Sequence, residues 1–335
     1  MTKPIFVIGR PAAAAATLAL LALIEWIGLA SAAEQWNFYM HQSAPNFATS
    51  RGAKLFTEEV EKASNGKLKI RLHLAGTLQI NASNITQAVG EDVVQIGDDL
   101  FNSGNIAVAG IPRLPMLIQS YDDFAKADAV LKPYIEKAFA QKGSTVLASY
   151  TYPLQFVWGR KKLSSLDDIK GMKLRVAQPE QGELVRRFGG VSITMSAPEV
   201  PSALDRGVVD GIFTAGVGAV LWKDLLKFGY VLIVNVNNSY FIANTDAYRK
   251  LSPELQAALR KAAEDAARWD QDTMKTEEAE SVELLKSAGY TFTQARPDEI
   301  SRAVGAMKPY WDEWAKARGP EIVEALAKVR AALGR

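Results

Sequence analysis

Hydrophobic and polar positions follow two different periods along most of this chain. KLKIRLHL, residues 67–74, alternates with a period of two, which is typical of a half-buried β-strand. Residues 47–64 place apolar side chains at helical spacing and end at Asn65-Gly66, a frequent helix terminus. A strand from Gln35 precedes this helix, and a short helix and the buried strand VVQIGDD follow it. The order β-α-β-α-β favours an α/β fold with a parallel-rich sheet covered by helices.

The later part of the chain continues this alternation. The pattern predicts a helix over 121–142, a strand over 144–153, a strand holding Arg175, a helix over 179–188, a strand over 191–196, a helix, turn and strand within 197–215, and one strand over 230–243 that crosses back. Ser252-Pro253 is a strong helix start, and helical periodicity then runs to about Leu285. A helix of more than 30 residues in such a protein usually spans two lobes. A strand at 290–293 and two helices divided by Gly319-Pro320 end the chain.

The first 33 residues have the features of a secretory signal peptide. Lys3 and Arg10 give a positive start, residues 11–24 are almost wholly apolar, and Ala30-Ser31-Ala32 offers small residues for cleavage. An uncleaved membrane anchor is the alternative, but the apolar run is short for a bilayer and Glu25 interrupts it. We therefore expect cleavage after Ala32 or Ala33 and export of the remaining chain.

Composition narrows the class of protein. The 335 residues allow two domains or one large one, and 48% hydrophobic with 23% charged residues is normal for a globular core. The net charge is only +2, and no basic stripe indicates nucleic-acid binding. The chain has no cysteine, which excludes a disulfide framework, thiolate metal sites and a cysteine nucleophile.

Motifs for catalysis are scarce. The chain has two histidines, His41 and His73, and His73 lies within an alternating strand where a structural role is favoured. No H-E-x-x-H, G-x-S-x-G or Walker A pattern occurs, no metal-ligand cluster stands out, and no cofactor is expected. GVGAV near 216 lacks the third glycine of a dinucleotide loop. The pairs Asp98-Asp99 and Asp167-Asp168 are common at strand ends and turns, so they are weak catalytic candidates.

Arg175 is the strongest candidate for ligand binding. It lies in GMKLRV, a short strand followed closely by a helix. In open parallel sheets, ligands bind beyond the carboxyl ends of strands. A guanidinium there matches a carboxylate with two charge-assisted hydrogen bonds. The residues alone leave two readings open: Arg175 binds a ligand carboxylate, or it pairs with a protein carboxylate such as Glu180 or Asp210.

Several stretches together resemble one family. DDIKGMKLRV, then RRFGGVSITMSAPEVPSALDRGVVDG, with SNGKLKIRLHLAGTL and the helix after LSPELQAAL, are similar to the DctP-like substrate-binding subunits of tripartite ATP-independent periplasmic (TRAP) transporters. The likeness covers residues 35 to about 330. It implies a periplasmic, type II-like two-lobe binding protein, without enzymatic activity, whose hinged cleft closes on a small organic acid. It also implies delivery of that acid to small and large membrane subunits, and it assigns Arg175 to the ligand carboxylate.

The resemblance divides the mature chain into two lobes, residues 34–152 with 242–280 and residues 153–241 with 281–335. A monomer is expected. Two other functions remain open: an exported enzyme acting on a carboxylate through Asp98-Asp99, and a sensor that presents its ligand to a membrane kinase.

This sequence departs from the family pattern in two places. Many members carry a second arginine about 20 residues before the first, where Gln155 lies here. Many also follow the D-G turn with an asparagine, where Phe213 and Thr214 lie here, with Trp222 shortly after. A cleft with one cation fewer and more aromatic surface suits a monocarboxylate with an apolar or aromatic body. Examples are benzoate-, mandelate- or cinnamate-like acids and 2-oxo acids, with a C4-dicarboxylate as the alternative.

Four further residues are weaker candidates for ligand contact. His41 and Gln42 follow the first strand, Tyr152 flanks the position without arginine, and Tyr240 lies near the return crossing. For each aromatic residue, ordinary core packing is the competing interpretation.

Overall fold

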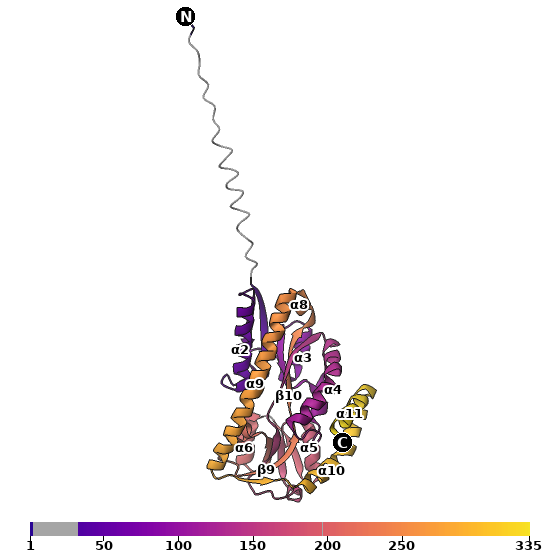
Figure 1. Cartoon of the computed structure of the whole chain (residues 1–335). Coiled ribbons are helices and arrows are strands. Elements are labelled where there is room, and N and C mark those ends of the chain that lie inside the picture. Colours follow the sequence, from indigo (N-terminus) through magenta and orange to yellow (C-terminus); the bar gives the residue numbers. More distant parts are fainter. Residues whose placement is uncertain (3–32, 196) are drawn as a thin grey trace.

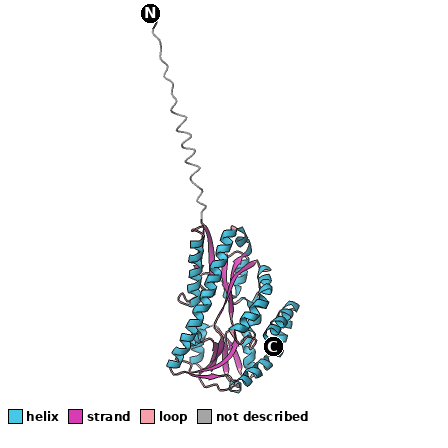
Figure 2. Cartoon of the chain, viewed as in Figure 1, coloured by secondary structure: helices cyan, strands magenta, loops and turns pink. Residues whose placement is uncertain are grey.

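The computed structural model describes residues 1–2, 33–195 and 197–335. Figures 1 and 2 show two lobes, one above the other, each built around a β-sheet with helices outside. The predicted signal peptide falls almost wholly on residues 3–32, outside the described part, and stays a prediction. Within the described part, no helix combines the length and the apolar character needed to cross a membrane.

The first lobe contains a five-stranded sheet. Its strands, in spatial order, are β2 (Leu68–His73), β1 (Glu34–Met40), β3 (Ile96–Asp99), β10 (Asn238–Asn244) and β4 (Ser144–Thr151). β1 is parallel to β2 and β3, whereas β10 is antiparallel to β3 and β4. Helices α2 (Ala48–Ala63) and α9 (Pro253–Ser287) cover one face, and α3 (Ile85–Gly90) and α4 (Tyr121–Ala140) cover the other.

The second lobe contains a six-stranded mixed sheet. Its strands, in spatial order, are β11 (Thr291–Gln294), β9 (Phe228–Asn235), β5 (Gln155–Gly159), β8 (Gly211–Thr214), β6 (Lys173–Val176) and β7 (Val191–Thr194). Helices α5 (Pro179–Arg187) and α10 (Pro297–Lys316) pack on one face, and α6 (Val200–Asp205) and α7 (Gly216–Val220) on the other. The remaining short elements are α8 (Thr245–Lys250) and the 3₁₀ helices η1 (Ala82–Asn84), η2 (Asn102–Gly104), η3 (Ala107–Arg113), η4 (Leu166–Ile169) and η5 (Ala197–Glu199).

One predicted strand is wrong. Residues 230–243 do not form a single strand: β9 ends at Asn235 in the second sheet and β10 begins at Asn238 in the first. Asparagine has a low strand propensity, and three asparagines between 235 and 238 interrupt the apolar run. The chain therefore changes sheets at 236–237, which moves residues 238–241 out of the expected second lobe, and we propose that the lobes divide there.

The C-terminal helix also reaches beyond its expected lobe. Helix α11 (Pro320–Leu333) packs against α4, and Lys137 forms an ion pair with Glu321 at 2.8 Å. Tyr134 donates to Glu324 at 2.9 Å in the same contact. The last helix therefore joins the second lobe to a helix of the first.

The predicted long helix is confirmed. Helix α9 spans 35 residues, and the Ser252 hydroxyl accepts the Leu255 N–H at its start. Gln271 of α9 accepts a hydrogen bond from Thr151 at the end of β4, and Glu278 accepts the Gly216 N–H beyond β8. Gln271 and Glu278 are seven residues apart, which is about 10 Å along a helix. The same helix therefore holds the facing edges of both lobes a short distance apart (Figure 1).

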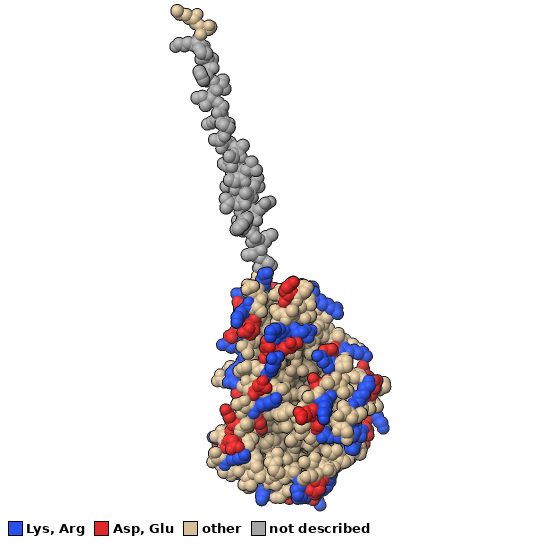
Figure 3. All heavy atoms as spheres, in the orientation of Figure 1, with Lys and Arg blue, Asp and Glu red and all other residues tan. Residues whose placement is uncertain are grey.

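Charges of both signs mix over the surface. Figure 3 shows lysine and arginine side chains interspersed with aspartate and glutamate on the visible face. This distribution agrees with 39 basic and 37 acidic residues in the whole chain.

Gly52 and Gly305 should respond in opposite ways to alanine. A Cβ on Gly52, in α2, would lie 1.9 Å from an Asp270 oxygen on α9, whereas one on Gly305, in α10, would meet no atom within 4 Å. We expect Gly52→Ala to destabilise the protein by about 1–3 kcal/mol through overpacking. Gly305→Ala should stabilise it by about 0.5–1 kcal/mol through helix propensity. Urea denaturation measures both, and a neutral Gly52→Ala would contradict tight packing of α2 on α9.

Candidate ligand-binding site between the lobes

Arg175 lies in β6 with 5% of its surface exposed. Leu174 and Val176 point into one core of the second lobe, so Arg175 points to the other face of the sheet. Its Nε donates to the Met195 carbonyl at 3.0 Å, and its Nη1 donates to the Phe213 carbonyl at 3.4 Å. Burial lowers the pKa of Arg175 to about 10, with Glu199 acting in the opposite direction. The guanidinium is therefore charged at neutral pH.

The two carboxylates considered as protein partners of Arg175 have other contacts. Glu180 lies 3.9 Å from Arg318, and an Asp210 oxygen accepts the Lys173 N–H at 2.8 Å. Within the described residues, neither forms an ion pair with Arg175. A guanidinium has five N–H donors, and the two carbonyl contacts use two of them. The remaining N–H donors of Arg175 can therefore bind acceptors other than these two backbone carbonyls.

Three other predicted residues lie at the same edge of the second sheet. Gln155, Thr214 and Arg175 belong to adjacent strands in the order β5-β8-β6. Gln155 is buried opposite Asn235, and the Thr214 carbonyl accepts the Trp158 Nε1–H at 3.0 Å. Phe213 reaches Arg175 through its carbonyl, because its ring is fully buried in the core.

The facing edge of the first lobe holds His41 and Tyr152. His41 Nε2 lies 2.8 Å from the Tyr152 hydroxyl, and His41 Nδ1 lies 3.4 Å from the Asp98 carboxylate. Burial lowers the pKa of His41, but the Asp98 carboxylate outweighs it and leaves a net raised value. Gln42 is half-buried, and its side-chain oxygen accepts the N–H groups of Ser43 and Ala44.

Asp98 and Phe101 are site residues that the sequence did not single out for binding. Asp98 is fully buried and accepts hydrogen bonds from Tyr150 at 2.8 Å and Ser239 at 2.5 Å. Phe101 is 39% exposed, and its ring centroid lies 6.0 Å from that of His41. An acidic residue at the end of a buried strand was the available signal for Asp98. No pattern marked Phe101, because Leu100-Phe101 is only a short apolar pair between polar residues.

The Asp98-Asp99 pair does not form a carboxylate dyad. Successive side chains of a strand point to opposite faces. Asp98 lies on the face covered by α2 and α9, whereas Asp99 accepts a hydrogen bond from Thr86 on the other face. The arrangement that would support an enzyme acting through this pair is therefore missing. Groups of three or more metal-ligating side chains are also absent from the described residues.

The two half-sites lie close to each other along the chain. Tyr152 directly follows the first-lobe strand β4, and Gln155 begins the second-lobe strand β5 three residues later. Three residues span at most about 10 Å. Helix α9 fixes the same two edges at a similar separation through Thr151 and Gly216. The structure thus brings His41 and Tyr152 to one side, and Gln155, Thr214 and Arg175 to the other.

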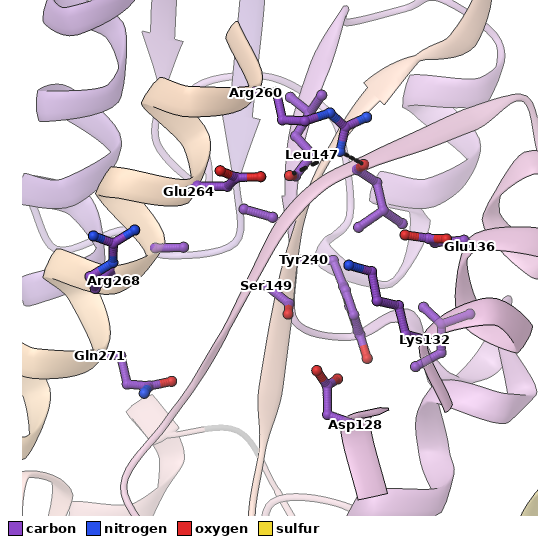
Figure 4. A pocket seen from close by; sticks show the side chains of 14 residues that line it. Asp128, Lys132, Glu136, Leu147, Ser149, Tyr240, Arg260, Glu264, Arg268 and Gln271 are labelled. Carbon is purple, nitrogen blue, oxygen red and sulfur yellow. Dashed lines mark hydrogen bonds between the residues drawn. The ribbon is translucent and has the colours of Figure 1, made fainter. Parts of the chain in front are cut away.

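Trp222 and Tyr240 lie elsewhere. Trp222 is 7% exposed and packs in a hydrophobic cluster with Phe156 and Trp158. Tyr240 lines a separate cavity of about 350 Å³ beside the edge strand β4. Figure 4 shows Asp128, Lys132 and Glu136 of α4 on one side of this cavity, and Arg260, Glu264 and Arg268 of α9 on the other. Arg260 donates to the Val146 and Leu147 carbonyls of β4.

Comparison with known proteins adds independent evidence. Residues 39–317 match the family model DctP, described as bacterial extracellular solute-binding protein, family 7. The sialic acid-binding periplasmic protein SiaP of Vibrio cholerae is 26% identical over 298 residues, covering 82% of this chain and 87% of that protein. The C4-dicarboxylate-binding periplasmic protein DctP of Rhodobacter capsulatus is 24% identical, covering 86% and 89%.

Solved structures share the fold. A Bordetella pertussis extracytoplasmic solute receptor binding pyroglutamic acid superposes with a TM-score of 0.80 at 24% identity, covering 90% of this chain and 100% of that chain. A TRAP periplasmic solute-binding protein of Roseobacter denitrificans with bound β-D-glucuronate has a TM-score of 0.80 at 20% identity, covering 89% and 99%.

Proposed function

The chain belongs to family 7 of the bacterial extracellular solute-binding proteins, the TRAP receptors, and from this premise we propose that it captures an organic monocarboxylate between its lobes. Receptors of this family are binding proteins that work with TRAP membrane subunits, and the named relatives are periplasmic. The proposed ligand has an apolar or aromatic body. The protein acts as a monomer in the periplasm and hands the acid to the small and large membrane subunits.

The buried guanidinium of Arg175 is the observation that carries the carboxylate part of this proposal. A charged group at 5% exposure needs a compensating partner, and a ligand carboxylate suits its planar fork. Pyroglutamate and glucuronate, the ligands named for two proteins of the same fold, each carry one carboxylate. In our proposal, Gln155 and Thr214 lie beside the acid group as neutral polar contacts.

The apolar part of the ligand would meet the first lobe. Tyr152 and Phe101 flank His41 with ring centroids 6.1 and 6.0 Å from it, which gives that edge aromatic surface. The Phe213 and Trp222 rings pack in hydrophobic clusters, so they do not supply this surface. A C4-dicarboxylate is the second candidate, favoured by the relative named for that ligand and by the raised pKa of His41.

A thermal-shift screen of residues 34–335 tests the proposed ligand class. The panel holds aromatic and branched monocarboxylates, 2-oxo acids, and succinate and malate. A ligand at 100 times its dissociation constant stabilises the folded state by about 2.7 kcal/mol, which is a measurable shift. We expect the largest shifts from the aromatic or branched acids. Larger shifts from succinate or malate would replace our ligand with the dicarboxylate.

A further inference from the structure

Three side chains of the first lobe form a chain of contacts that ends at the candidate site. The Asp98 carboxylate lies 3.4 Å from His41 Nδ1, and His41 Nε2 lies 2.8 Å from the Tyr152 hydroxyl. The three come from different segments: Asp98 lies in β3, His41 follows β1, and Tyr152 follows β4. Asp98 is fully buried, whereas Tyr152 is half-buried at the edge facing the second lobe.

Asp98 itself is held in place by two further donors. Tyr150 and Ser239 donate to its two carboxylate oxygens at 2.8 and 2.5 Å. These two bonds fix the position of the Asp98 carboxylate beside His41. The other groups around His41 are Asp99 of β3, the Phe101 ring, and Tyr152, whose own surroundings include Asp270 of α9. The acidic groups that act on His41 are thus Asp98 and Asp99 of β3, and they favour its charged form.

The protonation state of His41 decides what Tyr152 can offer a ligand. If His41 is neutral with its proton on Nδ1, Nε2 accepts the Tyr152 hydroxyl proton, and Tyr152 can only accept from a ligand. If His41 is charged, Nε2 donates to the Tyr152 oxygen, and the hydroxyl proton is available for a ligand acceptor. A charged His41 therefore makes Tyr152 a hydrogen-bond donor.

We propose that Asp98 is a positioning residue that, through His41, sets the Tyr152 hydroxyl as a hydrogen-bond donor to the bound acid. The acid then carries an acceptor oxygen besides the carboxylate that Arg175 binds. This inference rests on the proposed function for the ligand, but its Asp98–His41 part does not depend on any ligand. It also places a second cation at the site, in the lobe opposite Gln155.

The effect of pH follows from the direction of the His41 shift. Its pKa is raised above 6.5 in the folded protein, so the folded state favours the charged form. The donor state of Tyr152 therefore persists to a higher pH than an ordinary histidine would allow, and it is lost as pH rises through the raised pKa. We expect discrimination in favour of acceptor-bearing acids to fall over the same pH range.

Imidazole NMR tests the Asp98–His41 contact without a ligand. The chain has two histidines, so His73→Gln assigns the His41 signals directly. We expect the pKa of His41 to lie above that of His73, whose pKa is lowered mainly by burial. Asp98→Asn should lower the His41 pKa by about one unit or more, because a neighbouring opposite charge is removed. Asp246→Asn, an exposed acid of the same lobe, is the control and should change nothing.

Calorimetry with a matched pair of probes tests the Tyr152 part. The probes are 2-oxo-3-phenylpropanoate and 3-phenylpropanoate, which differ by one acceptor oxygen. At pH 6 we expect wild type to bind the oxo acid about tenfold or more tightly than its partner, the size of one hydrogen bond to a charged network. Tyr152→Phe should remove this preference, and His41→Gln should reduce it.

Each outcome has a distinct meaning. An unchanged His41 pKa in Asp98→Asn overturns the positioning role, and if Asp98→Asn does not fold, a wild-type His41 pKa at or below that of His73 overturns it instead. Equal binding of both probes by wild type overturns the donor role of Tyr152. If neither probe binds but the His41 signals respond to Asp98 as expected, the positioning role is supported and the proposed aromatic ligand is wrong.

Discussion

Arg175→Met is expected to weaken binding of the acid by about 100-fold or more while leaving the protein folded. Removing one partner of a buried, hydrogen-bonded charge pair costs about 2–5 kcal/mol of binding free energy, or roughly 30-fold to several thousandfold. Arg175 is 5% exposed and touches the Met195 and Phe213 carbonyls, so its charge is desolvated before any ligand arrives. Methionine fills a similar volume. Removing the buried charge of Arg175 removes its desolvation cost in the folded state, which offsets the loss of its two hydrogen bonds.

Isothermal titration with the acid that gives the largest thermal shift measures this effect. Arg175→Lys keeps the charge but loses the planar fork, so it should lie between wild type and Arg175→Met. Arg160→Met is the control, because Arg160 is an exposed arginine of the same lobe that also donates to a backbone carbonyl. Tight binding by Arg175→Met would show that Arg175 does not bind the carboxylate. Loss of folding in Arg175→Met with normal binding in Arg175→Lys would indicate a structural role.

Local pattern predicted most elements of the fold. The alternation of KLKIRLHL became β2, and the Ser252-Pro253 start and unbroken periodicity became α9. These signals work because side-chain period and end residues act within a few positions of the chain. The prediction of one strand over 230–243 was wrong because local pattern does not show where the chain leaves one sheet for another. The segments on both sides of this crossing, β9 and β10, have the sequence pattern of strands. Only the asparagines at 235, 237 and 238 marked the break between them.

The candidate site was harder to predict than the fold. Arg175 could be found because a charged residue in an apolar strand is a local contradiction that needs a partner. The contacts of Asp98 could not, because they join residues 57 and 141 positions away, and only the folded sheet brings these together. Phe213, Trp222 and Tyr240 show the same limit. Aromatic residues near a motif suggest ligand contact, but which face of a strand each occupies depends on register, which the sequence does not give.

The cavity between α4 and α9 is lined by charged residues but is separate from the candidate ligand-binding site. It is lined by charged residues of both signs, and in the described residues no two of them form an ion pair with each other. Its walls belong to the first lobe and to α9, so lobe closure on a ligand beside Arg175 would not involve it directly. Farther along α9, Gln271 at the end of this lining contacts Thr151 of the first lobe, and Glu278 contacts Gly216 of the second lobe.

Asp270→Asn is expected to stabilise the protein by about 3 kcal/mol at pH 7. Asp270 of α9 is fully buried, and neither carboxylate oxygen has a hydrogen-bond partner among the described residues. Burial, reinforced by the nearby Asp98 charge, raises the pKa of Asp270 to about 9 from 3.8. At pH 7 this difference corresponds to about 4 kcal/mol of lost stability. A buried asparagine amide without hydrogen-bond partners costs about 1 kcal/mol, so the expected net stabilisation is about 3 kcal/mol.

The raised pKa of Asp270 also predicts how the stabilising effect of Asp270→Asn changes with pH. Below pH 3.8, Asp270 is protonated in both the folded and the unfolded state, so Asp270→Asn should differ little from wild type. Between that pH and about 9, the unfolded state releases the proton and the folded state retains it, so wild type loses stability while the variant does not. The difference in unfolding free energy should therefore grow from pH 4 to pH 8 in urea titrations.

A matched control separates this effect from general changes in helix charge. Asp272 lies on the same helix two residues later and is exposed, so Asp272→Asn should change stability by less than about 0.5 kcal/mol at every pH. A gain in Asp270→Asn that does not vary with pH would mean that Asp270 is ionised in the folded state. A loss of stability would mean that its carboxyl group makes hydrogen bonds that an amide cannot replace. The expected result would instead show that a buried, protonated carboxyl lies behind Asp98 and Tyr152 and against Gly52 of α2, where its burial lowers stability.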